Sequence, residues 1–241
     1  MKVHIEGMLH EAIFIKRINR FLAEIQWNDS IHKAHVPNTG RMKELLFEGA
    51  RVIVRSIENE KRKTKFDLLM VYMDQGLVAI DSKLPNVILE NAFRTHGIGH
   101  LCKYDFFKKE VQYGNSRIDL LLNKEKELAF IEAKCVTYVR DDHVASFPDA
   151  PTERGRKHVI ELMNIVKENM RGVVIFVVQR EDALYFTPNQ ERDPAFAAVV
   201  EEAAAVGVEF YAFTCKVSKN EVKIDKEIPV VLTHRKNNDN I

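Results

Sequence analysis

The fold of this chain is decided by the stretch Glu110–Val139, which reads EVQYGNSRIDLLLNKEKELAFIEAKCVTYV. It contains three strand-like runs, which Gly114-Asn115 and the turn over Asn123–Lys126 separate. Consecutive strands joined by short turns pair in the antiparallel sense. The stretch therefore predicts an antiparallel meander of three strands, Glu110–Tyr113, Arg117–Leu122 and Leu128–Val139.

Helix and strand patterns alternate around this meander. Pro85–Arg94 predicts a short helix before it, and Glu153–Met170 predicts a long helix that follows Thr152 and ends at Gly172. Further along, Val173–Val178 and Val208–Lys216 are typical of strands. The segment between these strands has the start and stop signals of another helix, Asp193, Pro194 and Gly207. This order predicts an α/β domain with a mixed central sheet.

The N-terminal third of the chain has a different pattern, with short strand-like runs and turns between them. The runs are Phe14–Ile18, Phe21–Trp27, Ala50–Ile57 and Leu68–Met73. They favour a small five-stranded β-barrel. We therefore predict two domains, a barrel over residues 1–82 and the α/β domain over residues 83–241.

Composition limits the class of protein. Of the 241 residues, 46% are hydrophobic and 29% are charged, which is typical of a globular chain. No apolar run is long enough for a membrane helix and no signal peptide is evident, so we expect a cytoplasmic protein without membrane contact. Cys102, Cys135 and Cys215 form no disulfide or zinc pattern. Because the net charge is only +1, any surface that binds nucleic acid must be local.

The meander places acidic side chains on one face of its sheet. Side chains two residues apart on a strand share a face, so Arg117 and Asp119 share one, as do Glu132 and Lys134. A four-residue turn that pairs Leu122 with residue 127 would place Arg117 opposite Glu132 and Asp119 diagonal to it. A two-residue turn at Gly114-Asn115 would place Glu110 opposite Asp119.

Three carboxylates and a lysine would then meet, and such like charges destabilise a sheet unless a cation neutralises them. Oxygen ligands favour Mg²⁺ or Mn²⁺. A metal of this kind polarises a phosphoryl oxygen and activates water, while Lys134 could stabilise the developing charge. The pattern predicts phosphodiester hydrolysis; the alternative from the same spacing is a solvent-facing sheet surface with ordinary ion pairs.

Asp119, twelve intervening residues and then Glu132-Ala133-Lys134 resemble the PD-(D/E)xK nuclease signature, although Ile118 stands where the proline would be. Longer strings resemble the sugar fermentation stimulation protein family along nearly the whole chain. These strings are His35–Met42, Ser116–Leu120, Ile131–Lys134, Phe147–Ala150 and Thr152–His158.

That resemblance implies an OB-like N-terminal barrel, a PD-(D/E)xK restriction-endonuclease-like second domain and DNA binding of low sequence specificity, with RNA as an alternative. It further implies that Asp119 and Glu132 are catalytic metal ligands, that Lys134 is the catalytic lysine and that Glu90 is a further acidic residue on the first core helix. Glu110 joins the predicted ligands through its place in the meander. A non-catalytic DNA-binding regulator of sugar metabolism that keeps a nuclease fold is the alternative function.

Candidate contacts to nucleic acid lie in two further segments and on the meander. The start of the helix after Thr152 combines exposed N–H groups with basic side chains, and the loop His35–Arg41 combines a turn with an arginine. Each could equally be structural, as a solvated helix start or a loop held by its turn residues. The candidates are His35, Asn38, Arg41, Arg117, Arg154, Lys157 and His158.

Overall fold

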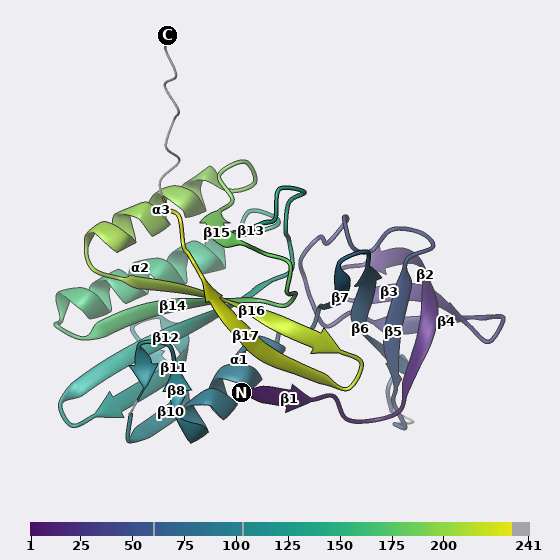
Figure 1. The fold of residues 1–241 in the computed structure, drawn as a ribbon, viewed down its shortest axis with the longest axis horizontal. Helices are drawn as coiled ribbons and strands as arrows, with labels where there is room; N and C mark the ends of the chain where they lie inside the picture. The colour runs from purple at the N-terminus through teal and green to yellow at the C-terminus, as the bar shows by residue number, and fades with distance from the viewer. Residues whose placement is uncertain (60, 103, 233–241) are drawn as a thin grey trace, which may run out of the picture.

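The computed structural model describes residues 1–59, 61–102 and 104–232, and it contains a β-barrel beside a larger α/β unit (Figure 1). The barrel unit consists of β2 (Leu9–Asn19), β3 (Leu22–Trp27), β4 (Ser30–His35), β5 (Arg51–Ser56), β6 (Phe66–Met73) and β7 (Gly76–Ala79). The strand order is β4-β3-β2-β5-β6-β7, and a parallel β4–β6 pairing closes five of these strands into a barrel. The predicted OB-like barrel is confirmed.

The second unit is built on a seven-stranded sheet in the order β1-β17-β16-β14-β12-β11-β10. Its strands are β1 (Lys2–His4), β10 (Phe106–Tyr113), β11 (Ser116–Lys124), β12 (Glu127–Val136), β14 (Arg171–Val178), β16 (Glu209–Ser218) and β17 (Glu221–Ile228). Strands β12, β14 and β16 run parallel, and the remaining pairs are antiparallel, so the mixed sheet is also confirmed. Short strands form two small sheets, β8 (Gly97–Ile98) with β9 (Leu101–Cys102) and β13 (Val144–Phe147) with β15 (Tyr185–Pro188).

Helices cover both faces of the large sheet. Helix α1 (Leu84–Thr95) packs on one face, and α2 (Glu153–Lys167) and α3 (Pro194–Ala205) pack on the other (Figure 1). Thr152 and Asp193 cap α2 and α3 by accepting hydrogen bonds from backbone N–H groups, as their positions predicted. The apolar core on the α1 face continues into barrel residues such as Leu69 and Met70, so the two units share a core.

The domain boundary between residues 82 and 83 stays a prediction. The structure shows how the two units are connected on either side of it. Strand β1 pairs with β17 of the large sheet, although the sequence assigned residues 2–4 to the barrel domain. The backbone N–H of Ala79 donates to the carbonyl of Gln179 at 3.1 Å. The buried Gln179 side chain donates in turn to the carbonyls of Ala79 and Asp81. These hydrogen bonds therefore hold the end of the barrel unit against the end of β14.

The hairpin between β11 and β12 corrects the predicted register. The turn spans two residues, because Glu125 has a left-handed φ of 53° and Lys124 pairs with Glu127. The predicted four-residue turn was therefore two residues too long, and the predicted register of β11 on β12 was shifted by two residues. A shift of two keeps every side chain on its predicted face, since the side-chain period of a strand is two. The turn at Gly114-Asn115 has the predicted register, with Tyr113 opposite Ser116.

The end of α2 also differs from the prediction. The helix ends at Lys167, and Asn169, with a φ of 62°, makes the turn that Gly172 was expected to make. Gly172 lies inside β14, and a Cβ there would come within 2.8 Å of the carbonyl oxygen of Leu162 on α2. This glycine therefore permits the close approach of helix and strand.

We expect Gly172→Ala to lower the free energy of unfolding by about 1–3 kcal/mol, because the methyl group would force α2 away from the sheet. Urea denaturation monitored by circular dichroism measures this change. An unfolding midpoint equal to that of the wild type would contradict the close packing of α2 on β14.

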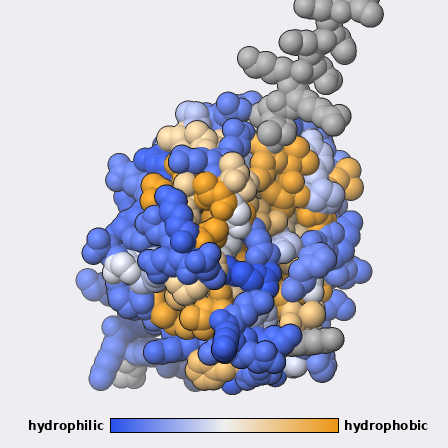
Figure 2. All heavy atoms as spheres, turned by 90° about the vertical axis from the view of Figure 1, so that its left-hand side faces the viewer, coloured by the Kyte–Doolittle hydropathy of each residue, from blue (hydrophilic) through white to orange (hydrophobic). Residues whose placement is uncertain are grey.

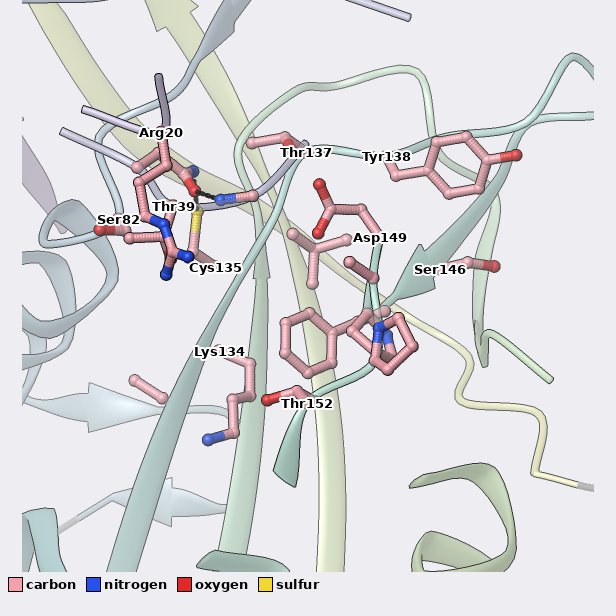
Figure 3. Close-up of a pocket in the computed structure, with 18 residues that line it drawn as sticks. Arg20, Thr39, Ser82, Lys134, Cys135, Thr137, Tyr138, Ser146, Asp149 and Thr152 are labelled. Carbon is pink, nitrogen blue, oxygen red and sulfur yellow. Dashed lines mark hydrogen bonds between the residues drawn. The ribbon is translucent and has the colours of Figure 1, made fainter. Parts of the chain in front are cut away.

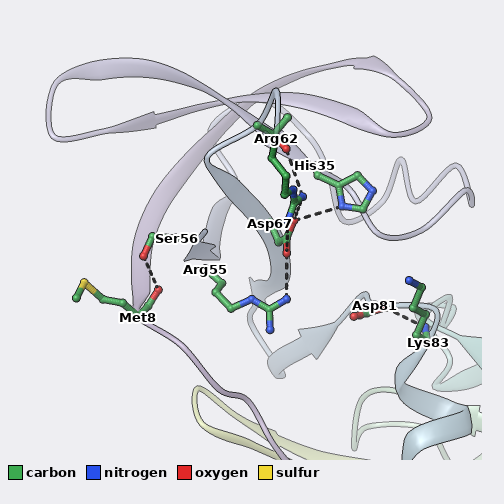
Figure 4. A network of polar contacts seen from close by, with 9 residues as sticks. Met8, His35, Arg55, Ser56, Arg62, Asp67, Asp81 and Lys83 are labelled. Atoms are coloured by element: carbon green, nitrogen blue, oxygen red, sulfur yellow. Dashed lines mark hydrogen bonds and ion pairs between the residues drawn. The ribbon is translucent and has the colours of Figure 1, made fainter. Parts of the chain in front are cut away.

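One charged network lies at the seam of the barrel, around the buried Asp67 of β6 (Figure 4). Arg62 donates to Asp67 at 2.6 Å and Arg55 donates to it at 3.0 Å. His35 lies 3.4 Å from the same carboxylate. Burial opposes ionisation of Asp67, but the two arginines outweigh this effect and hold its pKa below the ordinary value. The network ties β5 and the β5–β6 loop to β6, beside the β4–β6 closure.

We expect Asp67→Asn to destabilise the protein by about 1–2 kcal/mol at neutral pH, because two partly buried guanidiniums lose a charged acceptor. A carboxylate with a depressed pKa stabilises the fold above its unfolded pKa, and this contribution is lost as the pH falls through the folded pKa. The difference between wild type and variant should therefore shrink below about pH 4. Urea titrations over this range test it, with the exposed Asp74→Asn as the control. Equal stabilities at pH 7 would contradict the assignment.

Over the described residues, no helix combines the length and apolarity needed to cross a bilayer. Figure 2 looks onto the end of the α/β unit away from the barrel, where hydrophilic side chains surround separate apolar areas. The cytoplasmic location stays a prediction.

Candidate active site

A charged cavity of about 400 Å³ opens where α1, β11, β12 and the start of α2 meet. We call it the carboxylate cavity. Asp119, Glu132 and Lys134 all line it, as their common face on the sheet predicted. Glu110, Arg117 and Arg154 line its outer part. Six of the residues singled out in the sequence thus meet in one cavity.

Asp119 lies at the point where β11 and β12 separate. The last ladder pair between β11 and β12 is Leu120 with Ile131, and beyond it the Asp119 carboxylate accepts the backbone N–H of Ala133 at 2.9 Å. Asn86 of α1 donates to the other carboxylate oxygen at 2.9 Å. The side chain therefore replaces a missing ladder bond and is fixed in direction.

Glu132 lies deeper and is only 3% exposed. Lys134 donates to its Oε1 at 2.7 Å, and the buried His158 of α2 contacts the same oxygen through Nδ1. The second oxygen, Oε2, is buried and has no hydrogen-bond partner among the described residues. A buried carboxylate oxygen without a partner is costly and marks a position where a ligand would be bound.

The two carboxylates differ in their electrostatics. Burial raises the pKa of Asp119, and the nearby charge of Glu132 raises it further. Burial also opposes ionisation of Glu132, but Lys134 and His158 outweigh it and hold the pKa of Glu132 below its ordinary value. The pair therefore consists of one carboxylate whose ionisation its neighbours favour and one whose ionisation the site opposes.

The other two predicted metal ligands are placed less favourably. Glu110 lies at the rim with a left-handed φ of 52°, and its exposed carboxylate is 3.6 Å from Arg117. Glu90 does not line the carboxylate cavity; it pairs with Arg94 at 2.7 Å and Lys109 at 2.8 Å. In the described ranges, no three acidic, histidine or cysteine side chains form a group that could hold a metal ion. Of the four predicted ligands, Asp119 and Glu132 lie inside the cavity, Glu110 lines its rim and Glu90 lies outside it.

Asn86, not Glu90, is the α1 residue that reaches Asp119. Sequence reasoning missed it, although the two residues are four apart and share a face of the helix. The local sequence pattern predicts which face of a helix is buried, but it does not predict the position of the helix along the sheet. Here the predicted and observed positions differ by one helical turn.

Cations surround the mouth of the carboxylate cavity. Lys83, Arg117 and Arg154 are exposed and line it; the sequence had not singled out Lys83. Arg154 also lies 3.4 Å from His158, while Lys157 is exposed and donates to the carbonyl of Asn115. His158 is buried against Glu132, so it supports this carboxylate and presents no surface to a ligand. The predicted phosphate contacts on α2 therefore reduce to Arg154 and Lys157.

The three candidates from the barrel loop lie apart from Asp119. The His35 side chain belongs to the Asp67 network. Asn38 is buried, donates to the carbonyl of Ile80 at 2.8 Å and accepts from the N–H of Gly40. Arg41 is exposed beside a separate small pocket. Of these, Asn38 holds the loop in shape, which is the structural alternative that its sequence left open.

A family model described as the SfsA N-terminal OB domain matches residues 15–80, and one described as the sugar fermentation stimulation protein RE domain matches residues 83–221. The chain belongs to the sugar fermentation stimulation protein family. The resemblance read from its sequence strings is thereby confirmed.

Relatives of this family match at high identity over nearly their full length. The sugar fermentation stimulation protein homolog of Alkaliphilus metalliredigens is 53% identical over 95% of this chain and 100% of its own length. The homolog of Thermoanaerobacter sp. is 46% identical over 91% of this chain and 95% of its own. A solved structure, described as Pyrococcus furiosus SfsA in complex with Ca²⁺, is 27% identical with a TM-score of 0.84, covering 96% of this chain and 99% of that one.

Proposed function

We propose that this family member binds nucleic acid with little sequence preference and hydrolyses phosphodiesters with Mg²⁺ or Mn²⁺ in the carboxylate cavity. The observation that carries the proposal is the buried Oε2 of Glu132, which has no partner in the described part of the chain; Glu132 lines the same cavity as Asp119. Exposed cations at the mouth fit an anionic polymer. DNA is the proposed partner, with RNA as the alternative.

The residues present fit a hard divalent cation. Carboxylate oxygens are the ligands that such ions prefer, and an ion between Asp119 and Glu132 would relieve the cost of burying Oε2. The related Pyrococcus furiosus protein was solved with Ca²⁺, which is also a hard cation. Asp119 and Glu132 would hold the metal, with Glu110 at the rim as an outer partner. A bound ion of this class polarises a phosphoryl oxygen and lowers the pKa of a coordinated water.

The protein's own side chains have separate tasks in this proposal. Lys134 keeps its ammonium beside Glu132, where it can stabilise charge that develops on a phosphate. His158 and Asn86 fix the directions of the two carboxylates. Arg117 and Arg154 hold phosphates at the cavity mouth.

Cleavage of labelled single- and double-stranded DNA and RNA with Mg²⁺ or Mn²⁺ tests the proposal directly. We expect Lys134→Met to slow cleavage at least about 100-fold, because a donor aimed at developing charge is lost. Anisotropy measured without metal should show binding retained by the variant. Equal cleavage by the wild type and Lys134→Met would contradict the role of this lysine.

A second candidate function rests on the compensated charge of Glu132. Since the Lys134 ammonium pairs with this carboxylate and His158 contacts the same oxygen, the cluster is electrostatically tolerable without a metal. This favours a non-catalytic DNA-binding regulator that keeps the nuclease fold. It predicts salt-sensitive binding and no cleavage product with any divalent ion.

A further inference from the structure

A second cavity, of about 380 Å³, lies between the barrel and the α/β unit (Figure 3). We call it the junction cavity. One wall comes from barrel residues Asn38, Thr39 and Gly40, and the facing wall comes from the loop between β13 and α2 and from the end of β12. Two of the sequence strings typical of the family, His35–Met42 and Phe147–Ala150, thus meet here although about a hundred residues separate them.

The junction cavity adjoins the carboxylate cavity. Both are lined by Ser82, Ala133, Lys134, Phe147 and Thr152, so the two cavities lie side by side between Asp119 and the barrel loop. Figure 3 shows the Lys134 ammonium pointing out of the junction cavity, and its partner is Glu132 of the carboxylate cavity. A strand whose phosphate enters one cavity therefore has the other cavity beside its next nucleotide.

Asp149 gives the junction cavity its distinctive chemistry. Its Oδ2 accepts the backbone N–H of Met42 at 3.1 Å, which fixes the side chain, and a Cβ at Gly40 would come within 2.7 Å of this oxygen. No described residue donates to its Oδ1, and Figure 3 shows the carboxylate pointing into the cavity. A fixed carboxylate oxygen in a confined space is suited to accept a hydrogen bond from a ligand N–H group.

The rest of the lining fits a flat ring attached to a phosphate chain. Phe147 is half-buried, packs edge-on against Phe196 and contributes to both cavities. Arg20 reaches the cavity from the barrel, is exposed, and forms no ion pair within the described ranges. An arginine can bind a phosphate, and an aromatic side chain can stack on a base. A cavity of this volume can hold a small ring system.

We propose that the junction cavity holds one unpaired nucleobase of the strand whose phosphate enters the carboxylate cavity, and that Asp149 selects bases with an exocyclic amino group. The inference rests on the proposed function. Cytosine presents its N4 amino group to a carboxylate, and adenine and guanine carry amino groups too, whereas the single N–H of thymine lies between two carbonyls that repel the carboxylate. The base must be unpaired, because pairing in a duplex would engage its amino group. Single strands, flaps and frayed ends are therefore the substrate class.

Anisotropy titrations in EDTA with labelled oligo-dC and oligo-dT test base selection without any cleavage. We expect the wild type to bind oligo-dC about tenfold more tightly, which corresponds to one hydrogen bond to a charged group. Asp149→Asn should reduce this ratio to near one, whereas the exposed Asp141→Asn should leave it unchanged. Arg20→Ala should weaken both oligonucleotides equally and lower the salt dependence of binding by about one phosphate contact.

An oligonucleotide of N4,N4-dimethylcytosine keeps the ring but lacks the amino donors, so it tests the wild type even if Asp149→Asn does not fold. We expect it to bind like oligo-dT. Three results would overturn the base pocket and leave the nuclease proposal standing. They are a ratio of oligo-dC to oligo-dT affinity near one in the wild type, full binding of the dimethylated strand, or an unchanged affinity ratio in a folded Asp149→Asn. A tenfold ratio without cleavage in Mn²⁺ would support the pocket and contradict the nuclease proposal. No binding to either strand would overturn both.

Discussion

Asp119→Asn is expected to reduce metal-dependent cleavage about 1000-fold, because the substitution removes one of the two carboxylates proposed to hold a cation inside the carboxylate cavity. The amide oxygen of asparagine can still accept the N–H of Ala133, so the fold should be preserved. Cleavage of a labelled strand in Mn²⁺ measures the rate, and electron paramagnetic resonance measures free Mn²⁺. The variant should bind Mn²⁺ more weakly and still bind DNA in EDTA.

Glu90→Gln is the matched control for this prediction. Its carboxylate pairs with Arg94 and Lys109 outside the cavity, so cleavage and Mn²⁺ binding should both remain near the wild-type values. A loss at Glu90 as large as that at Asp119 would restore the assignment that the resemblance implied. Full activity of Asp119→Asn would remove this residue from the mechanism.

Phe176→Ala is expected to have the largest effect on stability. Phe176 is fully buried in the central strand β14, stacks on Phe186 with ring centroids 3.8 Å apart and lies 6.4 Å from Phe210. Replacing a buried phenylalanine by alanine costs about 3–5 kcal/mol, because a cavity remains in the core. This is a large share of the 5–15 kcal/mol typical of folded proteins. Urea denaturation followed by circular dichroism measures it.

Phe106→Ala provides the comparison for a phenylalanine at the surface. Phe106 lies on the edge strand β10 and is 57% exposed, so its removal should change stability by less than about 0.5 kcal/mol. Similar losses in the two variants would mean that the α2–α3 face of the sheet is not the rigid core described above.

The common face of Asp119, Glu132 and Lys134 could be predicted because it depends on the two-residue period of each strand and on whether the register between the strands is odd or even. The prediction survived a register error of two residues for the same reason. The place of Glu90 could not be predicted, because the slide of α1 along the sheet is set by packing of its apolar face and not by its own sequence pattern. The predicted position of α1 was wrong by one helical turn, and Asn86 occupies the position beside Asp119 that was expected for Glu90.

The sequence by itself determined the barrel, the mixed α/β unit, the faces of the central strands and the family. These properties follow from local periodicity, turn residues and short strings, each of which acts over a few neighbouring residues. The tertiary structure alone decided that Glu132 has a buried oxygen without a partner, that His158 supports it and that Asp149 faces a cavity shared with the barrel. Such properties depend on burial and on contacts between segments that are far apart in the sequence, and these arise only when the chain has folded.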